Sequence, residues 1–481
     1  MEEKKTKAIP YSYKKVSCWD DYLKSIKQFN TQIIIDFPII INPNNSKEYG
    51  DILKFKNCIF NHDIKIERVQ NPLLEINFTN CRFKNTVNIN CNKLKRLDLI
   101  WYQYSDKLIS ENYCSINSCF TKSMSISSNE FQMFCKIEGL NQTEDATFNF
   151  IANVFLKESR EIYPNSETEY TICTIKNSKI NNGSFNGNTY YLPFDFSNNS
   201  LKYNSHYKGH TFKGNKFQKA YFSKTDFGQK VDFFDCDFDG TTLFDGIKDI
   251  TTSKLHFRSC KFKGFTHFGS SEINTLSFEY TLFERNVSFN NANFNLLKFH
   301  EMRFEKGAFF DNINKNNSQV IENWNRTTLR EIKRELANSH NQIDYLRFKS
   351  YELNAYKNEV DTNKISWKDS LILYFNKESN NFGLDWTKGI TFIFRWSFLF
   401  YVLYILSYSA FAEDINCIPK IDNFLVNYLK FINPFSFLKL PIEDSENYSL
   451  SFSFFLLGKI FVSYGIYQMV QAFRKFGVNG G

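Results

Sequence analysis

Large apolar residues recur at intervals of five along the stretch from Phe257 to Phe309. The steps are five residues long, with six between Phe262 and Phe268 and again between Phe283 and Phe289. An α-helix buries every third or fourth residue and an ordinary strand every second one, so neither element explains this interval. The interval instead predicts a repeat architecture in which each unit of about five residues forms one face of a coil.

The interval begins near Phe55, has no fixed register between about 101 and 170, and is nearly unbroken from Phe196 onward. The residue two positions before each repeat residue is usually small or apolar, and the positions between are polar. Four faces would give a coil of about twenty residues, stacked on the next by strand-like hydrogen bonds about 4.8 Å apart. The expected core residues of the clearest coils are Phe212, Phe217, Phe222, Phe227, Phe289, Phe294, Phe299, Phe304 and Phe309.

In these segments the chain resembles the pentapeptide-repeat proteins. The likeness covers about residues 51–313 and is strongest in GHTFKGNKFQKAYFSKTDF and SFNNANFNLLKFHEMRF, which are Phe-centred variants of the repeat. The resemblance implies a mainly β fold, a right-handed quadrilateral β-helix. The six-residue steps and the irregular stretch 101–170 suggest bulged corners or an inserted loop. The alternative fold is a Phe-rich β-sandwich, in which four consecutive steps of five would be an accident.

Changes in pattern divide the chain into four parts. Residues 1–50 are expected to cap the first coil, because an open coil exposes unpaired backbone groups. The solenoid follows over 51–313, and residues 314–388 form a helical neck in which Thr328 and Glu331 suggest a helix start. The apolar stripes of the neck would be buried on the last coil or against other copies in an oligomer. Residues 389–481 form a membrane domain.

Two spans are predicted in the membrane domain, at about 389–412 and 448–473, joined by the loop 413–447. Each span exceeds the roughly 20 residues needed to cross a hydrocarbon layer of about 30 Å. Each contains one charged residue, Arg395 in the first and Lys459 in the second. The segment 421–440 in the loop is amphipathic and too polar to span, so it would lie on the outer surface or dip back into the membrane.

Lys459 is the residue that most needs an explanation, because a charge near the middle of a span is costly. It shares a helical face with Ser463, Tyr467 and Gln471. Two interpretations are open: these side chains line an aqueous path or a helix contact, or Lys459 snorkels or pairs structurally. Near the span ends, Arg395 can snorkel to the headgroups. Arg395, Arg474 and Lys475 are assigned to the membrane interface.

Positive residues flank the outer sides of the two spans, and the N-terminus carries no secretory signal, which favours cytoplasmic N- and C-termini. The eleven cysteines contain no CxxC spacing, as expected for core thiols in a reducing compartment. We therefore expect a multi-pass protein of the cell inner (cytoplasmic) membrane. Its arrangement resembles bacterial membrane proteins that carry pentapeptide repeats on an integral-membrane tail.

The sequence shows little sign of catalytic chemistry. Its seven histidines form no HxH or HExxH pattern, and the net charge of +8 is spread along the chain. No enzyme activity, cofactor, metal or nucleic-acid partner is expected. We expect a non-enzymatic membrane protein that presents a cytoplasmic solenoid for protein–protein interaction or signal sensing. The alternative is an oligomeric channel or membrane-perturbing effector gated by the solenoid, which would suit stress or phage defence. The expected partners are the lipid bilayer, an unidentified protein and further copies of the chain.

Overall fold

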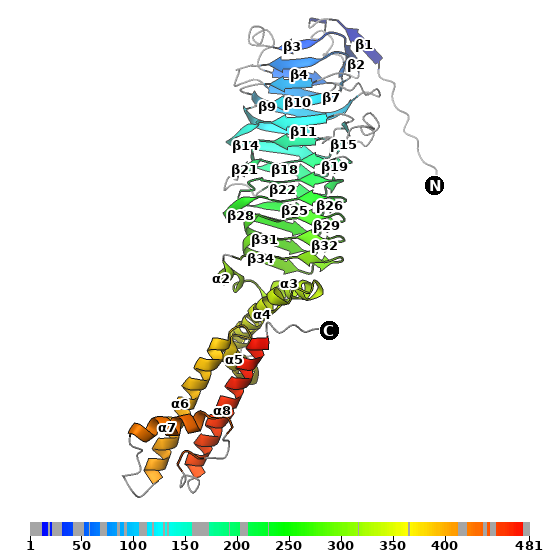
Figure 1. The fold of residues 1–481 in the computed structure, drawn as a ribbon. Coiled ribbons are helices and arrows are strands. Elements are labelled where there is room, and N and C mark those ends of the chain that lie inside the picture. Colours follow the sequence, from blue (N-terminus) through cyan, green and yellow to red (C-terminus); the bar gives the residue numbers. More distant parts are fainter. Residues whose placement is uncertain are drawn as a thin grey trace. The chain divides into compact units, whose positions relative to one another are not determined.

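The computed structural model of the chain contains two compact units, Met1–Ile321 and Glu322–Gly481. The described residues run from 12 to 474 with breaks, of which the longest are 22–30, 42–51, 68–74, 105–112, 156–172, 203–209 and 412–420. The first unit is a β-solenoid and the second is helical (Figure 1). Lys475, which was assigned to the membrane interface, lies outside the described residues.

The solenoid is built from two sheets of parallel strands, because each coil lies on the previous one with the same chain direction. One sheet has a single strand from each successive coil: β3 (Ile39–Ile41), β6 (Ile64–Glu67), β8 (Val87–Asn90), β10 (Tyr113–Asn117), β13 (Phe134–Glu138), β16 (Cys173–Lys176), β20 (Phe194–Asp195), β24 (Ala220–Tyr221), β27 (Thr242–Leu243), β30 (Thr266–His267), β33 (Val287–Ser288) and β36 (Ala308–Phe309).

The larger sheet wraps around the remaining faces of the coils. Its strands are β1 (Ser12–Val16), β2 (Thr31–Ile35), β4 (Ile52–Lys56), β5 (Cys58–Phe60), β7 (Glu75–Phe83), β9 (Leu94–Tyr104), β11 (Phe120–Ser127), β12 (Glu130–Phe131), β14 (Asn141–Ile151), β15 (Val154–Phe155), β17 (Lys179–Asn181), β18 (Gly183–Asn186), β19 (Thr189–Tyr190), β21 (Ser200–Lys202), β22 (His210–Lys213), β23 (Lys216–Phe217), β25 (Val231–Phe234), β26 (Asp237–Phe238), β28 (Lys248–Arg258), β29 (Lys261–Phe262), β31 (Glu272–Glu279), β32 (Leu282–Phe283), β34 (Asn293–His300) and β35 (Arg303–Phe304). Strands from the expected cap, 12–41, and from the irregular stretch 101–170 belong to these same two sheets.

Each regular coil buries four large apolar side chains, one for each face. In the coil that starts at β28 these are Phe257, Phe262, Phe268 and Ile273, all with no exposed surface. The steps between them are five, six and five residues, and a further step of five reaches Phe278, which pairs with Phe257 one coil earlier. The regular coil is therefore 21 residues long, with one six-residue face.

Phenylalanine rings stack along the solenoid because residues in register in adjacent coils are one strand spacing apart. Phe233 lies parallel to Phe212 with ring centroids 4.6 Å apart, and Phe257 follows at 4.7 Å. Phe278 continues the column at 5.1 Å. A second column runs through Phe222, Phe244, Phe268 and Phe289 on another face. These columns form the core of the solenoid.

The prediction that Phe309 belongs to the core is wrong, whereas the other eight phenylalanines expected in the core are buried. Phe309 is 40% exposed, and its neighbour Phe310 is 1% exposed. Phe310 stacks on Phe289 with ring centroids 5.0 Å apart and an angle of 3° between the planes. The same face takes six residues from Phe238 to Phe244, from Phe262 to Phe268 and from Phe283 to Phe289, and in the last coil too the residue six after Phe304 occupies the interior.

A ladder of buried asparagines satisfies the backbone at one corner of the solenoid. The side-chain nitrogens of Asn153, Asn188 and Asn215 donate to carbonyls one coil earlier, at 2.9, 2.7 and 2.6 Å. The side-chain oxygen of Asn188 also accepts from the side-chain nitrogen of Asn153 at 3.0 Å. Further along the same corner, the thiols of Cys236 and Cys260 donate to carbonyls in the equivalent way. The five cysteines described as free, Cys58, Cys135, Cys173, Cys236 and Cys260, are all buried.

After the last strand, α2 (Ser318–Ile321) completes the first unit. The described helices of the second unit are α3 (Arg326–Asn338), α4 (Gln342–Asn363), α5 (Trp367–Asn380), α6 (Trp386–Phe411), α7 (Ile421–Ile432) and α8 (Ser449–Phe473). The suggested start at Thr328 is wrong by one turn: α3 is capped by Asn325, whose side chain accepts from the Thr328 N–H at 2.9 Å. Thr328 and Glu331 therefore lie inside the helix.

The neck helices α3 and α4 pack antiparallel on each other. Glu352 of α4 accepts from Lys333 at 2.5 Å and from Arg330 at 3.2 Å. Burial alone would raise the pKa of Glu352, but these two hydrogen bonds outweigh it and hold the pKa below its usual range. These partly exposed ion pairs join the two helices.

Candidate functional site

The two long apolar helices, α6 and α8, pack antiparallel through small residues. Gly389 faces Met469, and a β-carbon on Gly465 would lie 2.4 Å from Cγ1 of Ile393. Small residues occur every seventh position on α8 and all are buried: Ser451, Gly458, Gly465 and Ala472. A stripe of small residues lets two helices approach closely, which is the usual way that helices pack inside membranes.

Large apolar side chains are exposed on the outer surface of this helix pair. Phe394, Phe398 and Leu406 of α6 are 53%, 51% and 58% exposed. Leu457 and Ile460 of α8 are 42% and 50% exposed. Both helices are long and apolar enough to cross a membrane. A water-soluble helical pair would instead bury such residues and expose polar ones.

Lys459 lies in the interior, with 1% of its surface exposed. Its ammonium group donates to the backbone carbonyls of Asn433 at 2.7 Å and Lys430 at 3.4 Å, and lies 5.3 Å from the centre of the Phe455 ring. The two carbonyls belong to the C-terminal end of α7, where helix carbonyls lack intrahelical partners and carry partial negative charge. Lys459 therefore acts as a cap for α7.

The short helix α7 packs across α6 and α8. Phe431 is completely buried between them, against Gly458 of α8. On the α6 side, the Tyr401 hydroxyl donates to the Phe424 carbonyl at 2.9 Å, and Ser397 bonds the Tyr428 hydroxyl at 3.0 Å. The segment 421–440 thus contacts the middle of both long helices, and residues 436–439 lie outside the described residues.

The structure does not bring the four predicted polar side chains together. Lys459 points to α7, whereas Ser463 and Tyr467 are on the exposed side of α8, and Tyr467 is 62% exposed. Gln471 is also exposed, but its side chain accepts from Asn380 of α5 at 3.3 Å. An aqueous path through these residues stays a prediction.

Two of the residues expected at the membrane interface, Arg395 and Arg474, are described by the structure, and both side chains are exposed. The Arg395 side chain is 73% exposed and lies 3.9 Å from Glu378. Arg474 is exposed at the end of α8. Both are therefore free to reach a headgroup layer.

A network of amides joins α5 to the end of α8. The Asn380 side-chain nitrogen donates to the Gln468 side-chain oxygen at 2.5 Å. The Asn376 side-chain oxygen accepts from the Tyr464 hydroxyl at 3.1 Å and from the Gln468 side-chain nitrogen at 3.2 Å. Asn380 and Gln468 are 1% and 4% exposed. The sequence indicated neither this network nor the small-residue stripe, although the seven-residue spacing of the small residues is visible in it.

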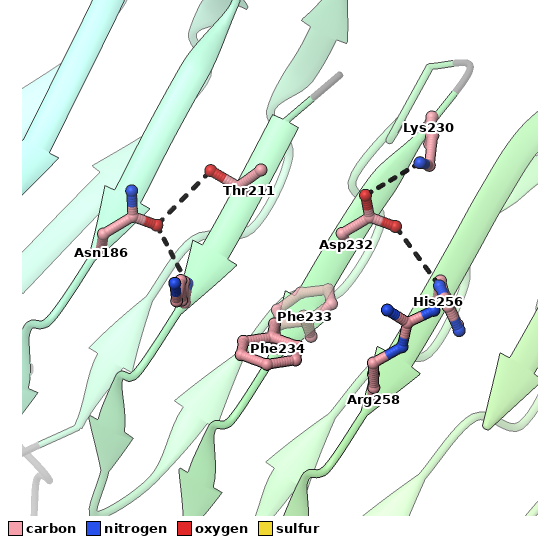
Figure 2. Close-up of a pocket in the computed structure, with 9 residues that line it drawn as sticks. Asn186, Thr211, Lys230, Asp232, Phe233, Phe234, His256 and Arg258 are labelled. Atoms are coloured by element: carbon pink, nitrogen blue, oxygen red, sulfur yellow. Dashed lines mark hydrogen bonds and ion pairs between the residues drawn. The ribbon is translucent and has the colours of Figure 1, made fainter. Parts of the chain in front are cut away.

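A separate candidate site is a hollow of about 400 Å³ on the outer surface of β22, β25 and β28 (Figure 2). Phe234 is 36% exposed there, although its neighbour Phe233 is in the core. Register places Lys213 and Arg258 on either side of Phe234, and the Lys213 ammonium lies 5.4 Å from the ring centre. The hollow therefore combines an apolar floor with two flanking cations.

Ion pairs surround this hollow. Asp232 contacts Lys230 at 3.0 Å and His256 at 3.5 Å, and Arg258 pairs with Glu279 at 2.8 Å. Burial alone would raise the pKa of Asp232, but its contacts with His256 and Lys230 outweigh burial and lower the pKa. Lys213, Lys230 and Arg258 line the hollow with one carboxylate, Asp232, and Glu279 pairs with Arg258 beside it. The cations still outnumber the carboxylates, so the surface favours an acidic group on a binding partner.

Among the described residues, no group of three or more His, Cys, Asp or Glu side chains could hold a metal ion. No protein-family model, curated protein or solved structure matches the chain. The solenoid and the two apolar helices are thus the basis for its proposed function.

Proposed function

We propose that this chain is a non-enzymatic integral membrane protein that holds a pentapeptide-repeat solenoid at the cytoplasmic face of a bacterial inner membrane. The observation that carries the proposal is the exposed apolar surface of α6 and α8, which includes Phe398 and Ile460. Leaving such surface in water is unfavourable by about 25 cal/mol per Å². The 21-residue coil with four buried faces supports the assignment to pentapeptide repeats.

The orientation rests on the charges at the two ends of the helix pair. Because α6 and α8 are antiparallel, Lys388 near the start of α6 and Arg474 after α8 lie on the same side. Positive residues favour the cytoplasmic side of the membrane. The solenoid and the C-terminus would then both be cytoplasmic.

The role of the solenoid in this proposal is to bind a protein partner. Phe234 with its flanking Lys213 and Arg258 fits an apolar side chain next to an acidic one, since exposed aromatic residues with cations dominate many protein interfaces. The partner site is tested with a photo-crosslinking residue at position 234 in cells. We expect an adduct that disappears in the Lys213→Glu and Arg258→Glu variants. The same residue at exposed position 272 is the control; equal adducts at both positions would contradict the partner site.

Membrane insertion is tested separately by extraction of cell membranes at alkaline pH. The full chain is expected to stay with the membranes, and a variant with aspartate at the exposed positions Phe398, Leu406 and Ile460 is expected to be lost from them. Release of the unaltered chain would contradict insertion. A reporter fused after Gly481 checks the orientation, and is expected to be active only in the cytoplasm.

A second candidate function is an oligomeric channel or membrane-perturbing effector, and the exposure of Ser463 and Tyr467 favours it. Hydroxyl groups on the outer face of a membrane helix gain hydrogen bonds when another helix covers them. This candidate predicts an oligomer in detergent and an ion flux in liposomes that falls when Ser463 and Tyr467 are replaced by Ala and Phe. A monomer that supports no ion flux would contradict this second candidate, and the first function would then be the remaining one.

A further inference from the structure

The depth of α7 follows from where it touches the two long helices. α6 has 26 residues and α8 has 25. Ser397 and Tyr401 lie within three residues of the middle of α6, and Lys459 lies two residues from the middle of α8. At 1.5 Å per residue, these contacts are within about 5 Å of the helix midpoints. A helix on the outer surface would touch the ends of α6 and α8 instead.

The exposed side of α7 is apolar. Leu425, Val426 and Leu429 are 62%, 51% and 58% exposed. This surface is continuous with that of α6, because Tyr428 contacts Phe398 with ring centroids 6.0 Å apart. α7 has 12 residues, which is about 18 Å of helix and too short to cross a layer of about 30 Å.

The backbone at the end of α7 has partners from protein, which a helix end inside a membrane requires because no water is present there. Lys459 donates to the carbonyls of Lys430 and Asn433 at this end. In the first turn of α7, Tyr401 donates to the carbonyl of Phe424. The Lys430 side chain is exposed, and its apolar stem lets the ammonium group extend away from the helix end in the direction of the headgroups. The arrangement meets the needs of a helix end at mid-depth.

We propose that α7 is a re-entrant helix whose Leu425, Val426 and Leu429 face contacts lipid acyl chains, and that Lys459 holds its C-terminal end at the middle of the bilayer. The proposal rests on the proposed function, in which α6 and α8 cross the membrane. It assigns Lys459 to a fixed position between helices and not to the wall of a pore. The occupant of the exposed α7 face is lipid, because that face continues the apolar surface of the membrane helices.

The proposal is tested by measuring depth in vesicles of phosphatidylethanolamine and phosphatidylglycerol. A nitroxide is attached to a genetically encoded azido side chain at Leu429, at Ile460 or at Phe473 of the full chain, so that the eleven native cysteines are not labelled. Collisions with oxygen report lipid exposure, and collisions with a water-soluble nickel chelate report aqueous exposure. We expect Leu429 to match Ile460, with both far deeper than Phe473.

The outcomes separate the two levels of the proposal. A shallow Ile460 would overturn membrane crossing itself, whereas a deep Ile460 with a shallow Leu429 would overturn only the re-entrant helix. In the Lys459→Met variant the label at Leu429 is expected to gain at least tenfold in its ratio of nickel to oxygen collisions. Lys459→Arg is expected to keep it deep, and Ile460→Met serves as the matched control one residue away. An unchanged depth in Lys459→Met would overturn the role of Lys459.

Discussion

The ring of Phe431 in α7 lies directly against the backbone of Gly458 in α8. A β-carbon on Gly458 would be 2.4 Å from Cζ of Phe431 and 2.6 Å from its Cε1. Phe431 is completely buried, so its ring has little room to move away. Gly458 is therefore the point on α8 at which α7 docks, one residue before the lysine that caps α7.

Replacing Gly458 by alanine is expected to loosen this contact. Alanine is better than glycine in a helix by about 1 kcal/mol, so a loss of stability would come from the clash with Phe431. We expect a net loss of about 1 to 3 kcal/mol, measured by thermal unfolding in detergent. Ser463→Ala on the exposed side of α8 is the control, and Phe431→Leu should restore part of the loss. A Gly458→Ala protein more stable than the parent would contradict the contact.

The asparagine ladder makes a prediction about the solenoid. Asn188→Leu removes the donor to Phe150 and the acceptor for Asn153, and leaves buried polar groups without partners. The expected loss is at least about 2 kcal/mol in the free energy of unfolding of the solenoid, measured with denaturant. Ser184→Ala, at a partly exposed position of the same coil, should change it by less than about 0.5 kcal/mol. Equal effects of the two substitutions would argue against the ladder.

The last coil offers a matched pair of phenylalanines. Phe310→Ala removes a buried ring that stacks on Phe289 and should cost about 3 to 5 kcal/mol. Phe309→Ala removes a side chain that is 40% exposed and should cost under about 1 kcal/mol. The two unfolding transitions decide which residue belongs to the core. If Phe309→Ala were more destabilising than Phe310→Ala, Phe309 would be the core residue and the interval of five residues would continue through the last coil.

Stability of the neck should depend on pH through Glu352. The pKa of this carboxyl is lower in the folded protein than in the unfolded chain, so its ionised form stabilises the fold. That contribution is fully present above the unfolded pKa of about 4.3 and is lost as the pH falls through the folded value. The free energies of helix unfolding of the parent and of Glu352→Gln, followed by circular dichroism, should differ by about 1 kcal/mol at pH 7, and the difference should shrink as the pH falls below the unfolded pKa. If the difference in stability between the parent and Glu352→Gln became larger in acid, the predicted sign of the effect would be wrong.

The solenoid could be predicted from the sequence because the strongest sequence pattern, the interval of five residues between phenylalanines, is also what drives the chain to form coils. A five-residue interval of phenylalanines can be buried only if the chain turns a corner at each unit. The interval could not show whether the step after Phe304 is five or six residues long, because Phe309 and Phe310 are adjacent and equally apolar. Only stacking on Phe289 distinguishes them.

The polar groups of the interior were less predictable. Asn188 has the same residue type as many exposed positions, and its role depends on a carbonyl in the preceding coil, 38 residues earlier in the sequence. The depth of α7 was similarly open, since an amphipathic helix suits a membrane surface as well as a buried crossing. The contact between Lys459 and Asn433, on which the proposed depth rests, joins residues 26 positions apart, so the pattern of the α7 segment alone could not reveal it.

The ring column through Phe212 has a consequence for how the solenoid opens. Its spacing widens from 4.6 Å at Phe212 and Phe233 to 5.1 Å at Phe257 and Phe278, and reaches 6.0 Å with a tilt of 56° at Phe278 and Phe299. Dispersion attraction falls steeply with separation, so within this column the ring of Phe299 is held least strongly by its neighbour. Within this column, fraying should begin at the C-terminal coil, and its backbone amides should exchange with deuterium before those around Phe233.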